Sequence, residues 1–181
     1  EAKLAAGDVP GAAVLFEAVL KRNPGLPETY FGLARVALFT GKLDAAKTHA
    51  AAATKLAPAL PLAWTMLGLV QEASGDLLSA LSLLMEGAKL GPDSFLCQFN
   101  AGRLLAATGK GPDALPYLTR ATELAPSNPD GFHALGQALK QIDWSNMRVL
   151  CIEDLKRTKQ FLRGTFPRRL NRRLSHWLYN F

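Results

Sequence analysis

The chain has 181 residues, of which 49% are hydrophobic and 20% are charged, so its composition fits an ordered core and excludes a disordered polar chain. No stretch reaches the roughly 18 consecutive apolar residues that a membrane-spanning helix needs. The net charge of +6 is uneven: residues 1–139 carry 11 Lys or Arg against 12 Asp or Glu, whereas residues 140–181 carry 10 against 3. This asymmetry indicates a basic interaction tail or cationic helix rather than a general binder of nucleic acid.

Glycine and proline recur with one period along most of the chain. Both return every 34 residues, at Gly7, Gly41, Gly75 and Gly109 and at Pro24, Pro58, Pro92 and Pro126. Two residue types that interrupt regular structure therefore mark an array of one supersecondary unit. Between the marks lie two apolar-periodic stretches of roughly 14 residues, each long enough for about four turns of helix. The unit is predicted to be helix, turn, helix.

In chain order, the array is predicted to cover residues 1–141. A partial repeat at 1–26 is followed by complete repeats at 27–60, 61–94 and 95–128, and then by a partial repeat at 129–141. The glycines are expected in the left-handed conformation at the turn inside each repeat, and the prolines between repeats. We expect three aspartates to cap the helices that follow these turns, namely Asp8, Asp44 and Asp76. Because residue 1 is Glu rather than Met and lies inside a repeat, we expect the sequence to be part of a longer protein.

Residues 142–181 depart from the repeat. The period predicts a further turn glycine and a closing proline, but Asp143 and Gln160 occupy those places. An apolar stripe still predicts a modified helix at about 145–163, paired with the helix at 129–141. Residues 167–181 are predicted to form a basic amphipathic helix with Trp177 on its apolar side, and its proposed tail surface consists of Arg168, Arg169, Arg172, Arg173 and Trp177.

Three roles stay open for this final helix. As a cap, it would cover the apolar face that a terminal repeat leaves exposed. It could instead lie on an anionic membrane through its Trp-bearing side. The third role is docking on a separate partner or on another part of the parent protein.

The repeats resemble the tetratricopeptide repeat. The family pattern is an aromatic residue, a Leu-Gly pair, a small residue, a bulky apolar residue, a second small residue and a proline, filled here by Trp64, Leu67, Gly68, Ala80, Leu84, Gly87 and Pro92. One period earlier the slots hold Tyr30, Leu33, Ala34, Ala46, Ala50, Ala53 and Pro58. One period later Gln98 replaces the aromatic residue, and Ala101, Gly102, Ala114, Leu118, Ala121 and Pro126 follow. The resemblance implies an all-α, right-handed α-solenoid, closed here by the C-terminal amphipathic helix.

The resemblance also implies that the first helices of successive hairpins line a concave groove. The corresponding inner positions, apolar at first and polar toward the end of the array, are Phe31, Arg35, Leu38, Leu62, Met66, Leu69, Leu96, Phe99, Asn100, Arg103, His133 and Gln137. Such a surface suits an extended peptide or an amphipathic helix with apolar anchors, and Arg35 and Arg103 would select acidic neighbours. Burial between hairpins stays open as an alternative for the apolar members.

Neither catalysis nor a cofactor or metal is predicted. The histidines His49, His133 and His176 lie in different elements, and no phosphate-binding glycine motif occurs. Cys97 and Cys151 lack the spacing of a metal or redox site and are predicted to be buried thiols. No nucleic-acid-binding module accompanies the basic tail. The compartment stays open, and the cytoplasm is favoured only slightly.

We therefore expect a non-catalytic protein–protein interaction scaffold that holds a partner peptide or helix in the groove. One alternative is the recognition arm of a larger multidomain enzyme, such as a transferase, whose catalytic part is absent from this sequence. The other is a peripheral membrane scaffold anchored by the basic C-terminal helix.

Overall fold

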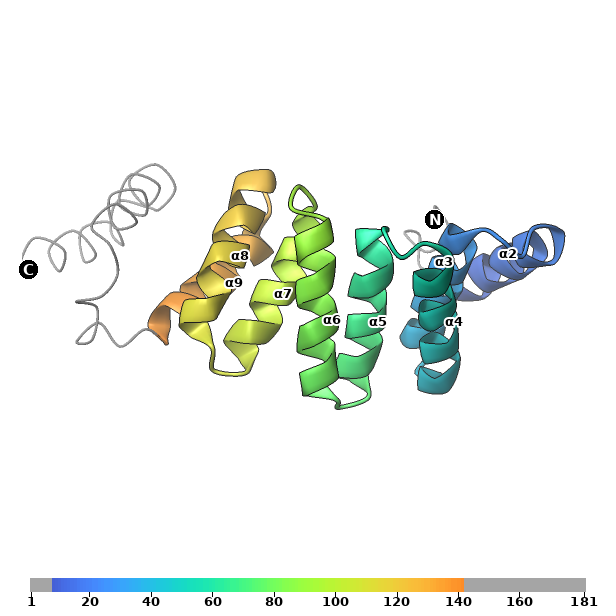
Figure 1. Ribbon diagram of the computed structural model, residues 1–181, viewed down its shortest axis with the longest axis horizontal. Helices are drawn as coiled ribbons and strands as arrows, with labels where there is room; N and C mark the ends of the chain where they lie inside the picture. The colour runs from blue at the N-terminus through green and yellow to red at the C-terminus, as the bar shows by residue number, and fades with distance from the viewer. Residues whose placement is uncertain (1–7, 142–181) are drawn as a thin grey trace, which may run out of the picture. The chain divides into compact units, whose positions relative to one another are not determined.

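The computed structural model describes residues 8–141, and all regular secondary structure in this range is α-helical. The helices are α2 (Val9–Arg22), α3 (Pro27–Phe39), α4 (Leu43–Leu56), α5 (Pro61–Ala73), α6 (Leu77–Leu90), α7 (Phe95–Ala107), α8 (Gly111–Leu124) and α9 (Pro129–Lys140). Figure 1 shows them side by side in chain order, paired as antiparallel hairpins. We call α3, α5, α7 and α9 the first helices, and α2, α4, α6 and α8 the second helices. The predicted all-α array of helical hairpins is confirmed.

Several predictions lie outside the described residues. They concern residues 1–7, Cys151, the modified helix near 145–163, and the basic helix at 167–181 with Arg168, Arg169, Arg172, Arg173 and Trp177. The capping, membrane-binding and docking roles of the last segment therefore stay predictions.

The turn inside each described repeat is built on its periodic glycine. Gly41, Gly75 and Gly109 have φ angles of 71°, 84° and 80°, the left-handed region in which a side chain would be strained. At the first of these turns the Lys42 N–H donates to the Ala37 carbonyl at 2.8 Å, and the Gly41 N–H donates to the Leu38 carbonyl at 3.1 Å. This Schellman arrangement satisfies the last carbonyls of α3 and reverses the chain, so the two helices of a repeat run antiparallel.

Two of the three predicted aspartate caps are confirmed. The Asp8 carboxylate accepts from the Gly11 N–H at 2.8 Å, and the Asp76 carboxylate accepts from the Ser79 N–H at 3.1 Å. The prediction for Asp44 is wrong, because α4 already begins at Leu43 and its N-cap is Lys42. Asp44 follows its turn glycine by three residues instead of one. It therefore lies in the first helical turn, where the positive end of the helix still favours a carboxylate.

Prolines occur both between and within the helices. The four periodic prolines lie between hairpins as predicted, and a second set opens first helices, where the missing N–H has no partner to lose: Pro27, Pro61 and Pro129. Pro116 departs from the expectation because it lies inside α8. Its side chain is exposed, and so is Pro112, whose carbonyl loses the usual helical donor and can be hydrated.

Small residues let the helices of a hairpin approach closely. Leu84 and Leu118 are completely buried. A β-carbon added at Gly68 would lie 2.7 Å from Leu84 Cγ, and one added at Gly102 would lie 2.5 Å from Leu118 Cγ. The leucines of α6 and α8 therefore fill the space that the glycines of α5 and α7 leave open, whereas the equivalent positions of α3 and α4 hold Ala34 and Ala50.

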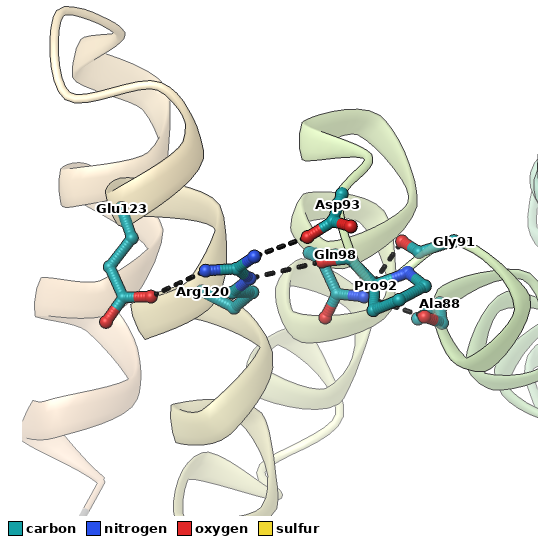
Figure 2. A network of polar contacts seen from close by, with 7 residues as sticks. All are labelled: Ala88, Gly91, Pro92, Asp93, Gln98, Arg120 and Glu123. Carbon is teal, nitrogen blue, oxygen red and sulfur yellow. Dashed lines mark hydrogen bonds and ion pairs between the residues drawn. The ribbon is translucent and has the colours of Figure 1, made fainter.

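Polar side chains fasten the turns between hairpins, as Figure 2 shows for the turn at Pro92. The buried Gln98 amide donates to the carbonyls of Ala88 and Gly91 at 2.7 and 3.1 Å. In the preceding repeat the equivalent Trp64 Nε1–H donates to the Pro58 carbonyl at 2.7 Å. Gln98 therefore takes over the hydrogen-bonding role of the aromatic residue, because the side chains of Gln98 and Trp64 both donate to backbone carbonyls at the hairpin junction.

The guanidinium of one arginine spans the same junction from the other side (Figure 2). Arg120 of α8 donates to the Pro92 carbonyl at 3.2 Å and pairs with the carboxylates of Asp93 and Glu123. Asp93 belongs to the turn before α7, so this arginine ties the third complete repeat to the end of the second.

The first helices form a layer of their own. The second helices α4, α6 and α8 each pack between their own first helix and the next one, and successive first helices also contact one another directly. In a first helix, one side therefore faces second helices and two flanks face neighbouring first helices. The fourth side is left for solvent within residues 8–141.

Candidate partner-binding surface

Alignment of the first helices by the 34-residue period identifies their free side. Apart from the residues that open the helices (Pro27, Pro61, Phe95 and Pro129), three sets of equivalent positions are exposed or half-buried in every repeat. Their residues are Glu28, Leu62, Leu96 and Asp130; Arg35, Leu69, Arg103 and Gln137; and Phe39, Ala73, Ala107 and Gln141. Spacings of seven and four residues place the three sets on one side of a helix. We call this side the first-helix face.

The first-helix face is mainly apolar over α5 and α7, and on α3 it carries Phe39 beside the charged residues Glu28 and Arg35. The side chain of Phe39 is 75% exposed and that of Leu96 is 51% exposed, and both are large apolar groups in contact with water. Leu62 and Leu69 are half-buried on α5, the first helix that follows α3 with Phe39 and precedes α7 with Leu96. Together these four side chains form a candidate interaction surface, although other large apolar residues are exposed on second helices, such as Leu78 of α6.

The face becomes polar at α9. Asp130, His133, Gln137 and Lys140 are all exposed. The Gln137 amide and a ring nitrogen of His133 lie 2.9 Å apart, and the Gln141 amide donates to the Ala106 carbonyl of α7 at 2.7 Å. A partner that followed the whole face would therefore meet charged residues and Phe39 at α3, mainly apolar side chains at α5 and α7, and hydrogen-bonding groups at α9.

Met66 does not lie on this face, and the prediction that it lines an open groove is wrong. Its side chain is only 5% exposed and belongs to a core cluster with Val70 of the same helix and with Ala34, Ala37, Ala46 and Ala50 of α3 and α4. The equivalent residues Gly32 and Ala134 are buried as well, whereas Asn100 of α7 is half-buried. This side of α5 packs against the preceding hairpin of α3 and α4, so Met66 fills the joint between two repeats.

The other predicted apolar residues divide between core and surface. Phe31 and Leu38 are half-buried and pack against the cluster that contains Met66. Phe99, also half-buried, stacks on Phe95 with ring centroids 5.3 Å apart and an interplanar angle of 11°. These side chains support the exposed residues of the first-helix face and contribute only part of their surface to it.

The two predicted arginines are already engaged within the protein. Arg35 Cζ lies 5.7 Å from the centroid of the Phe31 ring, within the range of a cation–π contact. Both terminal nitrogens of Arg103 donate to the Glu72 carboxylate, at 2.9 and 2.6 Å. Asn100 is also half-buried, and its amide donates to the Leu96 carbonyl at 2.7 Å.

Sequence reasoning missed Phe39 and Glu72. Phe39 is equivalent to Ala73 and Ala107, and only a strict 34-residue alignment shows that this position is exposed in every repeat. Glu72 is equivalent to Leu38 of the preceding repeat. Because that residue is apolar, the repeat pattern did not indicate a charged residue at this position. The pairing of Glu72 with Arg103 on the next first helix has no signal in sequence spacing.

Residues 8–141 contain no cluster of potential metal ligands. In that range no three His, Cys, Asp or Glu side chains come together as metal ligands would, and no helix is long and apolar enough to cross a membrane. Cys97 is fully buried, with the Thr65 hydroxyl donating to its sulfur at 3.3 Å. The prediction of a buried thiol is confirmed for Cys97.

Comparisons with known proteins agree with the repeat architecture. A family model described as the tetratricopeptide repeat matches residues 3–70, and no curated protein shows significant similarity in sequence. The structure is similar to that of a thermophilic tetratricopeptide-repeat protein of Thermus thermophilus, with 24% identity, a TM-score of 0.65, and coverage of 84% of this chain and 89% of that one. It is also similar to YrrB, described as a tetratricopeptide-repeat protein with an unusual peptide-binding site, with 21% identity, a TM-score of 0.56 and 77% of each chain covered.

A third similar structure belongs to an enzyme. The O-GlcNAc transferase of Thermobaculum terrenum shares 26% identity with a TM-score of 0.57, over 62% of this chain but only 22% of the transferase. The fold matches 168 structurally characterised chains. The architecture alone therefore does not distinguish among the functions that such a fold can carry. The choice among functions rests on the first-helix face.

Proposed function

Because the chain is a tetratricopeptide-repeat protein, we propose that it is a non-catalytic scaffold whose first-helix face holds a segment of a partner protein. The partner segment is a peptide or an amphipathic helix with apolar anchor side chains. The single observation that supports this proposal is the exposure of large apolar groups on the free side of the first helices, above all Phe39 and Leu96.

The physical basis is burial of these side chains on binding. A partner that covered Leu96 would remove apolar surface from water at about 25 cal/mol per Å². A few such anchors carry most of the affinity of an interface, while the surrounding contacts provide fit. The structure keeps these side chains on rigid helices, so little ordering of this protein is needed when a partner binds.

The proposal is tested by selecting binders from a random peptide library displayed on phage, with the full chain as bait. The selected peptides are then measured by fluorescence polarisation against Leu96→Asp and Leu78→Asp. Leu78 is a matched control, because it is 81% exposed but lies on the second helix α6. We expect Leu96→Asp to weaken binding about tenfold or more and Leu78→Asp to leave it unchanged.

Two outcomes would overturn the proposal. One is a set of peptides that tolerates both substitutions equally, which would place binding elsewhere. The other is the absence of any selected peptide. Circular dichroism of both variants excludes loss of fold as the cause, and neither substitution touches the buried core.

A second candidate function is that of a recognition arm in a larger enzyme. The similarity to part of a transferase chain favours it. Sequencing the reading frame that encodes this chain tests the idea directly. A catalytic domain in the same frame would support it, and a frame that encodes helical repeats alone would reject it.

A further inference from the structure

Arg103 of the first-helix face forms a bidentate ion pair with Glu72, which precedes the face residue Ala73 on α5. Arg103 Nη1 donates to one carboxylate oxygen of Glu72 at 2.9 Å and Nη2 donates to the other at 2.6 Å. The pair joins α5 to α7, and its side chains are 21% exposed for Glu72 and 33% exposed for Arg103. Two parallel bonds fix the guanidinium more firmly than a single contact at the surface would.

No other charge lies on these two helices. Glu72 is the one charged residue in α5, and Arg103 is the one charged residue in α7. The remaining residues of the face on these helices are apolar: Leu62, Leu69, Ala73, Leu96 and Ala107. Because each charge is paired with the other, the centre of the face is neutral and apolar, although it contains an arginine.

We propose that Glu72 is a specificity determinant that makes the centre of the first-helix face reject charged partner side chains. This inference rests on the proposed function and names the chemistry of its partner: an apolar segment that carries no charge where it crosses α5 and α7. It replaces the expectation, drawn from sequence, that Arg103 selects acidic neighbours.

The reasoning is electrostatic. A carboxylate brought to Arg103 would have to displace the Glu72 carboxylate or lie beside it, and like charges brought together in this way weaken binding strongly. An ammonium group would meet a carboxylate that is already satisfied and would be repelled by the guanidinium. An uncharged segment disturbs neither member and still buries the leucines on both sides.

The test uses the strongest peptide selected on the wild-type chain and three variants of it, in which one central residue is Gln, Glu or Lys. Each peptide is measured by fluorescence polarisation against the wild-type chain, Glu72→Gln and Arg103→Gln. On the wild-type chain we expect the Glu and Lys peptides to bind about tenfold more weakly than the Gln peptide. Glu72→Gln should reverse the penalty for the Glu peptide, and Arg103→Gln should reverse it for the Lys peptide.

Matched variants separate this effect from a general change of charge. Glu123→Gln removes a carboxylate that pairs with Arg120 on the second helix α8, and it should leave all three affinities unchanged. The exchange of both residues, Glu72→Arg with Arg103→Glu, restores a pair and should restore the preference for the Gln peptide. Added salt should weaken the new binding of the Glu peptide to Glu72→Gln, because that binding is electrostatic.

The failures of the two proposals are distinguishable. The inference about Glu72 is wrong, and the proposed function stands, if Leu96→Asp still weakens binding but either the wild-type chain binds Glu and Gln peptides equally or Glu72→Gln leaves the preference unchanged. If binding ignores Leu96→Asp, the proposed function fails, and the inference about its partner fails with it.

Discussion

The two sides of the first helices differ in how closely the repeats agree. On the side packed against the second helices, one set of equivalent positions holds only small residues: Ala34, Gly68 and Gly102. On the first-helix face, one set of equivalent positions changes its chemistry from repeat to repeat: Arg35, Leu69, Arg103 and Gln137. Packing demands agreement, because no space is left for a larger side chain. The free side has no such packing constraint. Its residues can therefore differ between repeats, and these differences can determine which partner binds.

The largest expected effect is on the packed side. Leu84→Ala removes a fully buried side chain that fills the space above Gly68, and we expect the free energy of unfolding to fall by about 2–5 kcal/mol. Chemical denaturation followed by circular dichroism measures the change. Leu78→Ala, at an 81% exposed position of the same helix, should change the free energy by no more than about 0.5 kcal/mol. Equal effects of the two substitutions would show that the packed and free sides do not differ in this way.

The second prediction concerns a larger side chain at the same hairpin contact, whereas the first concerned a smaller one. Gly68→Ala adds a β-carbon 2.7 Å from Leu84 Cγ and 3.2 Å from the Leu84 backbone nitrogen, so the second helix must move. We expect a loss of about 1–3 kcal/mol, measured by the same denaturation experiment. Ala73→Leu, a larger increase on the first-helix face, is the control and should be tolerated because Ala73 is exposed. A stable Gly68→Ala variant would contradict the need for a small residue at the hairpin contact.

Much of the packed side was predictable from sequence, because it depends on local rules that repeat. A left-handed turn needs glycine, so the 34-residue period alone was enough to locate the turns at Gly41, Gly75 and Gly109. Hairpin contacts need a small residue opposite a bulky one, which identified Gly68 and Leu84 together. The prediction of Asp44 as a helix cap failed because it did not apply this period strictly. Asp44 lies three residues after its turn glycine, whereas the other two aspartates lie one residue after theirs.

The free side was predicted less well, because its residues depend on contacts between helices. Met66 was placed on the surface although its rotation on the helix points it toward the preceding hairpin. The pairing of Glu72 with Arg103 joins residues 31 positions apart on different first helices, and no local pattern encodes it. Phe39 was missed because its equivalents in the next repeats are alanines, which attract no notice in sequence.

The third prediction separates stability from recognition at Glu72. Glu72→Gln breaks an ion pair whose members are 21% and 33% exposed, so water already screens part of the interaction. We expect a loss of about 1 kcal/mol or less in the free energy of unfolding, together with the change of peptide preference proposed above. Denaturation and peptide binding are measured on the same preparation. A loss as large as that of Leu84→Ala would make Glu72 a structural residue rather than a determinant of the partner.

The smallest expected effect comes from a position where the packed side itself varies. His49 of α4 lies near the Tyr30 ring of α3, with centroids 6.2 Å apart, and its equivalents are Leu83 and Tyr117. Burial lowers the pKa of His49 below its usual value, and the nearby Glu17 carboxylate offsets part of this change. As the pH falls below about 6.5, the imidazole of His49 is therefore protonated in the unfolded chain before it is protonated in the folded one. The free energy of unfolding decreases over this range, until the pH has fallen below the lower pKa of the folded state.

This sign gives a direct measurement. The Tm of the wild-type chain should fall on acidification from about pH 7.5 to about pH 5.5, a range that brackets the free imidazole. His49→Leu introduces the residue of the equivalent position in the next repeat, which has no titrating group, so its Tm should fall less over the same range. An equal fall in both proteins would assign the pH dependence to other groups. A wild-type Tm that rises on acidification, with a flat response in the variant, would mean that the folded protein favours the protonated ring and that this half-buried slot tolerates charge.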